Sequence, residues 1–261
     1  MKESNTEFQG RRLYIMLPAY NEEKALPLLF DEIKKLPENL RIKVVVIDDG
    51  SSDTTYSICD GAREYLDIFV IRHEVNKGLG KTMYDGMKWL SEQDINDKTK
   101  KEGEPVAITL DADNTQPIEK IPDLLGKIDE GYDLVIASRF QKGARVTGLN
   151  TYRRFLSWVA SFIFRILFPN GARDYTCGYR AYRLSTIKLA FEKYGENFIN
   201  QPGFDCMADI LIKIGFLEVN IGEIPFFLHY ERKPTGSKMK VLRTIYHTLS
   251  ILIKRRFGNM S

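Results

Sequence analysis

Cysteine is scarce in this chain, with three among 261 residues. Cys59, Cys177 and Cys206 lie far apart and follow no metal-ligand spacing, which argues against a disulfide framework and against a zinc site. Buried thiols behave as small apolar side chains, and they stay reduced in the cytosol. We therefore interpret the three cysteines as reduced packing residues of a cytosolic protein.

Long hydrophobic runs are also missing. Residues 1–12 are polar and charged and contain no apolar core of a signal peptide, so we do not expect secretion by that route. The most apolar stretch, residues 155–168, is interrupted by Arg165 and is shorter than the roughly 20 residues that a membrane-spanning helix needs. We expect the chain not to cross a bilayer.

Glycine is absent where a dinucleotide-binding fold needs it. Residues 18–22, Pro-Ala-Tyr-Asn-Glu, follow the first predicted strand and contain no Gly-x-Gly-x-x-Gly pattern. Gly80-Lys81-Thr82 resembles the end of a phosphate-binding P-loop, but Val75 stands where that motif requires glycine. Hydride transfer and ATP hydrolysis are therefore disfavoured.

The composition is that of one soluble globular domain or two small ones, with 43% hydrophobic and 28% charged residues. The net charge is only +3, but residues 232–261 hold eight lysines and arginines and no acid. Positive charge is thus concentrated at the end of the chain. Residues 92–105 include the polar run 96–103, which we expect to be a solvated surface insertion without chemistry.

The first half of the chain alternates apolar strands with helical segments. We predict strands at 13–17, 42–47, 67–71, 106–110 and 134–137, with helices from about residues 22, 53, 79 and 118. Strands that are almost wholly apolar indicate a mainly parallel sheet covered by helices on both faces. The predicted fold class is therefore α/β.

Polar motifs follow three of these strands. They are residues 18–22, residues 48–51 (Asp-Asp-Gly-Ser) and residues 111–113 (Asp-Ala-Asp). In open parallel sheets, ligands bind beyond the carboxyl ends of the strands. The three motifs are therefore expected to meet at one crevice.

Asp111 and Asp113 directly follow a buried strand and suit a divalent cation. Mg²⁺ and Mn²⁺ prefer oxygen ligands and are commonly held by one or two carboxylates, with substrate phosphates completing the shell. This pattern points to a nucleotide-sugar transferase. The plainer alternative is that Asp113, Asn114 and Thr115 cap a helix that begins at Pro117.

Taken together, the motifs resemble the family-two glycosyltransferases of the GT-A fold. The later segments Ser138-Arg139-Phe140, residues 176–183, and Arg232 with Gly236-Ser237-Lys238 are similar to the dolichol-phosphate mannose synthase branch. That branch joins a nucleotide-activated hexose to a polyprenyl phosphate. The resemblance extends from about residue 13 to residue 238.

The resemblance implies a role for each matching residue. The nucleotide would be bound by Pro18, Tyr20, Glu22, Asp48, Asp49, Lys77, Asp111 and Ala112, and Mg²⁺ or Mn²⁺ by Asp111 and Asp113 with Thr115 or Gln116 nearby. The catalytic set would be Asp113, Arg139, Arg153, Arg232 and Lys238, and the phosphate of the lipid would meet Arg153, Ser157, Arg232 and Lys238. Plainer readings remain: Glu22 favours a helix start, Asp53 caps a helix, and Arg153 lies on a solvated face.

The chain departs from the branch at several positions. The branch usually has glutamine two residues after the second aspartate, where this chain has Thr115, with Gln116 one place later. The spacing of Gly236-Ser237-Lys238 is one residue shorter than usual. An acid in the helix after Gly203 is Asp209 rather than glutamate, and we do not assign it as a base.

A phosphate acceptor needs no general base. A sugar hydroxyl must lose a proton during attack, whereas a phosphate monoester has a second pKa of about 6 and is already a dianion at neutral pH. The difficulty is charge repulsion from the donor diphosphate, which a cation and a basic cluster would offset. We therefore predict direct displacement with inversion and no covalent enzyme intermediate.

Two segments suggest a membrane-facing surface. Residues 241–253 place apolar side chains at helical spacing opposite basic ones, as in helices that lie on anionic membranes, although an ordinary packed terminal helix fits too. Residues 155–164 form a second apolar segment beside Arg153. We expect an N-terminal arm at 1–12, a catalytic domain at 13–236 and a membrane-facing helix at 237–261.

The expected location is peripheral, at the cytoplasmic face of a membrane. The expected partners are a nucleotide-sugar donor, a polyprenyl or dolichyl phosphate and the membrane surface, with a small membrane subunit left open and no nucleic acid. The resemblance favours GDP-mannose as the donor, with UDP-glucose as the alternative. A family member with a soluble or saccharide acceptor, and a nucleotide-sugar binding protein without turnover, are the other two readings.

Overall fold

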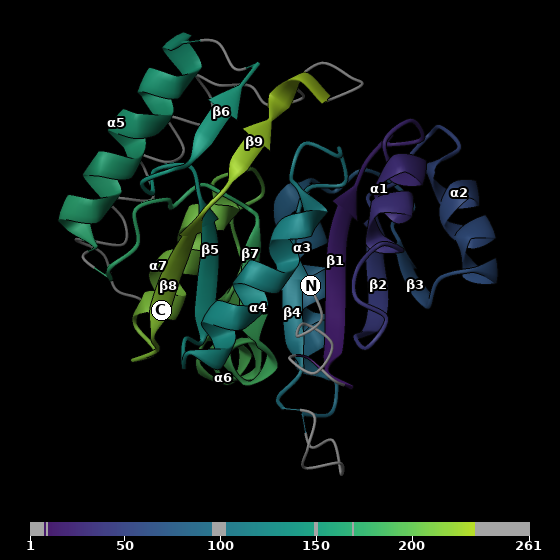
Figure 1. Cartoon of the computed structure of the whole chain (residues 1–261), viewed down its shortest axis with the longest axis horizontal. Coiled ribbons are helices and arrows are strands. Elements are labelled where there is room, and N and C mark those ends of the chain that lie inside the picture. The colour runs from purple at the N-terminus through teal and green to yellow at the C-terminus, as the bar shows by residue number, and fades with distance from the viewer. Residues whose placement is uncertain (1–7, 9, 96–102, 149–150, 169, 233–261) are drawn as a thin grey trace, which may run out of the picture.

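A seven-stranded mixed sheet forms the centre of the molecule (Figure 1). The computed structural model describes residues 8, 10–95, 103–148, 151–168 and 170–232. The strand order is β3-β2-β1-β4-β7-β5-β8. The strands are β1 (Arg12–Ala19), β2 (Arg41–Asp48), β3 (Ile68–Arg72), β4 (Val106–Thr109), β5 (Leu134–Ser138), β7 (Arg180–Arg183) and β8 (Ile221–Pro225).

Every neighbouring pair of strands is parallel except those of β7, which runs antiparallel to both β4 and β5. All residues of β4 and β5 are buried, as strands covered on both faces should be. The five predicted strands correspond to β1–β5 within a few residues. The mainly parallel α/β sheet expected from the sequence is thus confirmed.

The helices fall into groups that cover the sheet. They are α1 (Leu26–Ile33), α2 (Thr55–Gly61), α3 (Leu79–Ser91), α4 (Ile121–Asp129), α5 (Thr151–Leu167), α6 (Leu184–Tyr194) and α7 (Cys206–Gly215), with short 3-10 turns η1 (Ala62–Glu64), η2 (Ile118–Lys120), η3 (Gly195–Asn197) and η4 (Tyr230–Arg232). Helix α1 packs on α2, α6 packs on both α3 and α7, and α4 packs on β5 and β7. Helix α3 approaches the sheet closely because Gly86 lacks a side chain: a Cβ there would lie 2.5 Å from the Met16 sulfur.

Helices α1 and α2 begin later than predicted, and α4 begins at Ile121, after the 3-10 turn η2 at the predicted start. Helix α1 starts at Leu26 rather than near residue 22, because Pro27 fits only the first turn and residues 22–25 form a hydrogen-bonded turn before it. Helix α2 starts at Thr55 rather than at Asp53, whose carboxylate accepts the Thr55 N–H at 2.9 Å. The later starts leave both segments free to form loops at the end of the sheet.

The start of the domain lies before residue 13. Phe8 is buried in the core, Arg11 pairs with Asp129 at 2.5 Å, and Arg12 opens β1. The predicted arm at 1–12 therefore includes residues that belong to the folded domain, while 1–7 and 9 lie outside the described residues. Also outside them are most of the polar insertion (96–102) and the whole predicted helix at 237–261.

In Figure 1, helix α5 lies on the β8 side of the molecule, and a small second sheet lies above β5 and β7, between α5 and α3. The small sheet consists of β6 (Arg145–Thr147) and β9 (Phe227–His229), which run parallel. The predicted apolar helix around residues 155–164 is confirmed as part of α5. Within the described part of the chain, no helix combines the length and apolarity needed to span a membrane.

Candidate active site

The three polar motifs lie at one edge of the sheet, as predicted. β1, β2 and β4 are parallel neighbours, so the loops that follow Ala19, Asp48 and Thr109 leave the same edge. The strand order reverses at β1, since β2 lies on one side of it and β4 on the other. Such a reversal is where open α/β sheets bind ligands.

The loops after β1 and β2 are joined by side chain to backbone hydrogen bonds. Ser51 Oγ accepts the Asn21 N–H at 2.9 Å, and Thr55 Oγ1 accepts the Glu22 N–H at 2.8 Å. In return, Asn21 Oδ1 accepts the Ser52 N–H at 2.9 Å. Glu22 is buried where these loops meet. The first two motifs therefore form one rigid unit.

Asp48 and Asp49 are both buried and have different roles in the loop. Asp48 accepts the Ser51 N–H at 2.9 Å and lies 3.5 Å from the Arg72 guanidinium. Asp49 turns toward the segment before α3 and accepts the N–H groups of Lys77 and Gly78 at 2.8 and 2.9 Å. Asp49, for which we predicted nucleotide binding, thus also holds the Asn-Lys-Gly segment 76–78 in place.

Glycine permits the close approach of these two segments. Gly50 has φ +70°, and a Cβ there would lie 2.5 Å from the Val75 carbonyl carbon. Gly78, directly before α3, has φ +88°. Side chains at either position would strain the backbone or separate the loops. The packing therefore explains why the motifs contain glycine, without requiring direct contact between these glycines and a ligand.

Asp111 and Asp113 are held by the residues that follow them. Gln116 forms two hydrogen bonds with Asp111, accepting its N–H at 3.0 Å and donating to its carboxylate at 3.1 Å. Thr115 donates to Asp113 from its hydroxyl at 2.7 Å and from its N–H at 3.1 Å. Asn114 between them has φ +60°, which lets the loop turn back. In this geometry Thr115 and Gln116 orient the carboxylates, and their role as metal ligands stays a prediction.

The segment before β7 completes the edge. Because β7 is antiparallel to β4, with Arg180 opposite Thr109, residues 174–179 arrive at the same edge as Asp111. Thr109 Oγ1 donates to the Gly178 carbonyl at 2.7 Å. A Cβ on Gly178 would lie 3.5 Å from an Asp111 carboxylate oxygen, so the glycine leaves space beside that carboxylate.

Arg139 forms a buried ion pair with Asp174. Its guanidinium donates twice to the Asp174 carboxylate, at 2.7 and 2.8 Å, and once to Thr176 Oγ1 at 2.6 Å. Burial opposes both charges, but the pair outweighs it, so the pKa of Arg139 is raised and that of Asp174 is lowered. Asp111 also contributes to raising the pKa of Arg139, which places the arginine within electrostatic reach of the aspartate motif.

Asp174 was not predicted from the sequence. It is fully buried and also accepts the Arg139 and Cys177 N–H groups at 3.0 and 3.1 Å, which fixes the turn before β7. The only sequence signal was its place shortly before the 176–183 motif. Arg139 was predicted to lie near the phosphates or the sugar, and the contact with Asp174 shows what holds its guanidinium in place.

The remaining predicted residues are only partly placed. Pro18 lies beside Ile47, one residue before the end of β1, Tyr20 follows β1 and is half-buried, and Ala112 is buried between the two aspartates. The Lys77 side chain is exposed. The side chains of Arg153, Ser157 and Arg232, and all of Lys238, lie outside the described residues.

Asp209 and the three cysteines are also buried, and Cys177 among them lies in the turn before β7. Asp209 forms a buried ion pair with Lys213 at 2.8 Å, consistent with our not assigning it as a base. The three cysteines are free and buried. Burial raises the pKa of Cys59 and of Cys177 to about 12, so these thiols are not nucleophiles at neutral pH.

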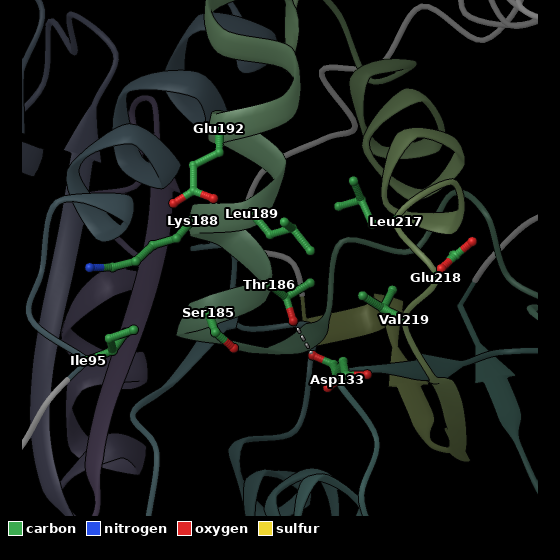
Figure 2. Close-up of a pocket in the computed structure, with 10 residues that line it drawn as sticks. All are labelled: Ile95, Asp133, Ser185, Thr186, Lys188, Leu189, Glu192, Leu217, Glu218 and Val219. Carbon is green, nitrogen blue, oxygen red and sulfur yellow. Dashed lines mark hydrogen bonds between the residues drawn. The ribbon is translucent and has the colours of Figure 1, made fainter.

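A shallow cavity of about 410 Å³ lies away from the motifs (Figure 2). Asp133 and Val219 reach it from just before β5 and β8, and Ser185 and Thr186 from the first turn of α6. The Thr186 hydroxyl donates to the Asp133 carbonyl at 3.3 Å. This cavity is therefore at the opposite ends of β5 and β8 from the polar loops, and we do not place the active site there.

The arrangement defines a class of protein. An α/β sheet with an acidic Asp-Ala-Asp turn and an Asp-Asp-Gly loop at one edge is the GT-A fold of nucleotide-sugar transferases. A family model described as Glycosyl transferase family 2 matches residues 14–189. The chain belongs to glycosyl transferase family 2.

Individual relatives agree with this assignment. The undecaprenyl-phosphate mannosyltransferase of Micrococcus luteus is 31% identical over 230 residues, covering 87% of each chain. The polyprenol monophosphomannose synthase of Mycolicibacterium smegmatis is 30% identical over 234 residues, covering 88% of this chain and 81% of that protein.

A solved structure shares the fold. Glucosyl-3-phosphoglycerate synthase from Mycobacterium tuberculosis, in complex with Mn²⁺, UDP and glucosyl-3-phosphoglycerate, superposes with a TM-score of 0.65. The match covers 97% of this chain and 82% of that one, at 20% identity. At that identity the likeness supports the GT-A architecture alone.

Proposed function

We propose that this protein transfers mannose from GDP-mannose to a polyprenyl phosphate with inversion at the anomeric carbon. The observation that carries the proposal is the Asp111–Asp113 turn after β4, next to β1 where the strand order reverses, with Arg139 near enough for Asp111 to raise its pKa. The relatives that are about 30% identical over most of the chain are named for mannosyl transfer to polyprenyl carriers. Their names supply the substrate class.

A divalent cation, Mg²⁺ or Mn²⁺, fits the residues at this edge. Asp111 and Asp113 offer hard oxygen ligands, and Gly178 leaves room beside Asp111. Among the described residues, no cluster of three or more His, Cys, Asp and Glu side chains suits a metal, so donor phosphates and water would complete the shell. When bound, the cation neutralises charge on the departing nucleoside diphosphate.

The reaction needs positioning more than proton transfer. One bond forms between an acceptor phosphate oxygen and the anomeric carbon, and the bond from that carbon to the donor diphosphate breaks, with its electron pair leaving on the diphosphate. The acceptor is already a nucleophilic dianion, so no side chain has to remove a proton. Arg139, held by Asp174 near Asp111, stabilises negative charge at the donor. Arg153, Ser157, Arg232 and Lys238 are assigned to the acceptor phosphate.

A lipid acceptor requires the protein to dock on a membrane, and α5 offers a surface for docking. Trp158, Phe162 and Ile166 recur every four residues and expose 53%, 47% and 63% of their surface. The Trp158 and Phe162 rings stack with centroids 5.6 Å apart, which makes a continuous apolar stripe. We assign this stripe to the outer layer of a membrane, where the acceptor phosphate would meet Arg153 at the start of the same helix.

The proposal is tested by a matrix of labelled donors and acceptors. GDP-mannose, UDP-glucose and UDP-N-acetylglucosamine are each incubated with Mg²⁺ and a polyprenyl phosphate, and the organic phase is counted. We expect label from GDP-mannose, with the anomeric configuration inverted in the isolated product. Label from a UDP-sugar instead would correct the donor, and transfer only to a water-soluble acceptor would contradict the proposal.

A further inference from the structure

His73 lies between two carboxylates that belong to different elements. It follows β3 directly, is buried, and donates its backbone N–H to the Asp48 carbonyl at 2.8 Å. Its ring Nδ1 is 2.7 Å from Asp49 and its Nε2 is 2.9 Å from Asp85 on α3. No motif in the sequence pointed to this residue.

The two contacts favour one charge state of the ring. A neutral imidazole has one N–H donor and one bare nitrogen, and an ionised carboxylate can only accept. A neutral His73 would therefore turn a lone pair toward one of the two aspartates. With both aspartates ionised, both short contacts are hydrogen bonds only when the ring carries both protons, as the imidazolium ion.

Charges of opposite sign alternate from the surface to the loop. Lys81 donates to Asp85 at 2.6 Å, Asp85 faces His73, and His73 faces Asp49. The neighbouring charged side chains face elsewhere: Arg72 lies over the Tyr56 ring and approaches Asp48, and Glu74 and Lys77 are exposed. Among the basic side chains that the structure describes, His73 is the one in direct contact with the buried Asp49 carboxylate.

Asp49 in turn holds the segment that opens α3. It accepts the Lys77 and Gly78 N–H groups, and Gly78 immediately precedes α3. We propose that protonated His73 is a positioning residue for the nucleotide half of the donor, because it fixes Asp49 and, through Asp49, the loop at 76–78. The inference rests on the proposed function for its ligand, while the charge of the ring rests on the two carboxylate contacts alone.

Two variants separate this role from a merely structural one. His73→Gln keeps a polar side chain but loses the charge and one donor. The start of α3 is also tied by Gly80, whose N–H donates to the Pro202 carbonyl at 3.1 Å, so this variant should loosen the loop without unfolding the protein. Asp85→Asn replaces one carboxylate with an amide that can donate to Nε2, and a neutral ring then satisfies both partners.

The charge is read by nitrogen NMR of the imidazole rings at about pH 7.5, where a free histidine is mostly neutral. The chain has three histidines, and loss of one signal in His73→Gln assigns the residue. We expect both ring nitrogens of His73 to be protonated in the wild type, and only Nδ1 in Asp85→Asn. A bare ring nitrogen in the wild type would overturn the inference.

Its role is read by titrating GDP and UDP with Mg²⁺ into each variant in a calorimeter. We expect about tenfold weaker binding in His73→Gln, the scale of losing a hydrogen bond to a charged group, and a raised donor KM with little change in kcat. His73→Arg, which keeps the charge and two donors, should recover part of the affinity. Lys88→Gln, which breaks an exposed pair with Glu92 on the same helix, should bind as the wild type does.

The outcomes distinguish the inference from the function on which it rests. If the wild type binds nucleotide and His73→Gln binds equally well, the positioning role is wrong. If the wild type binds neither GDP nor UDP, the proposed function is wrong, and the NMR result still decides the charge of the ring.

Discussion

At the scale of single residues, Arg139 and Asp174 are the clearest case of one side chain keeping another charged and fixed in orientation. The arginine supplies a charge near Asp111, and the aspartate keeps that charge in one orientation through two hydrogen bonds. Both groups are largely removed from water, so neither could remain charged alone without a large cost. The site therefore depends on a residue that contacts no substrate in the proposed reaction.

We predict that Asp174→Asn lowers the free energy of unfolding by about 3 kcal/mol, because it leaves the Arg139 charge buried without its partner. Urea unfolding measures the loss. The matched control is Asp123→Asn, which breaks an exposed pair with Lys120 and should cost about 0.5 kcal/mol or less. Equal stability of the two variants would show that the Arg139 pair contributes nothing.

The same pair predicts a pH dependence. Because Arg139 lowers the pKa of Asp174 in the folded protein, its contribution to stability is complete above the unfolded pKa of about 4. It is lost as the pH falls through the lowered folded value. Asp174→Asn should therefore lose less stability than the wild type below about pH 4. A parallel acid limb in both proteins would contradict this.

At the scale of elements, the apolar patterns in the sequence predicted those strands whose burial shows in their own residues. β4 and β5 are buried along their whole length, and their sequences are short apolar runs, so their positions could be predicted from the sequence. The acidic turn at 111–113 and the Asp-Asp-Gly loop could be predicted for the same reason, because each directly follows a short apolar run. Their meeting at one edge then follows from the parallel sheet.

Elements that are stabilised by residues far away in the sequence could not be predicted. β7 reads Arg-Ala-Tyr-Arg, which carries no apolar run, and it becomes a central strand only because β4 and β5 pair with it on both sides. Arg180 within it is fully buried and donates to the Met207 and Tyr175 carbonyls. The His73 contacts likewise join three elements that are separate in sequence. Such pairings need the tertiary structure.

For α5, we predict that Trp158→Glu combined with Phe162→Glu abolishes flotation with vesicles that contain anionic lipid. Two charges on the exposed stripe would have to enter the membrane interface, while the fold is little affected because both side chains already face solvent. Leu28→Glu on α1 is the control, since Leu28 is 52% exposed and α1 lies at the other end of the sheet (Figure 1). Undiminished flotation of the double variant would remove α5 from the docking surface.

Truncation after Lys238 addresses the terminal segment separately. The basic, amphipathic pattern of residues 241–253 predicts that the shortened protein floats less well, and more so at low salt, where attraction to anionic lipid is strongest. Equal flotation of both lengths would assign docking to α5 alone.

At the scale of the whole molecule, the donor and the acceptor of the proposed reaction are assigned to different regions along the sheet. The loops that follow β1, β2 and β4 are assigned to the donor nucleotide, and α5, to which the lipid acceptor is assigned, lies on the β8 side of the molecule (Figure 1). The aspartate turn after β4 stands between them in the strand order. This arrangement would let the acceptor reach the sugar while the nucleotide remains bound.

The most direct test of the account is transfer of labelled mannose into the organic phase before and after chelation. We predict that EDTA abolishes transfer, that Mg²⁺ or Mn²⁺ restores it, and that Asp111→Asn combined with Asp113→Asn loses it at any metal concentration. Full turnover in EDTA, or in the doubly substituted protein, would contradict the assignment of the two aspartates to a cation and the donor diphosphate.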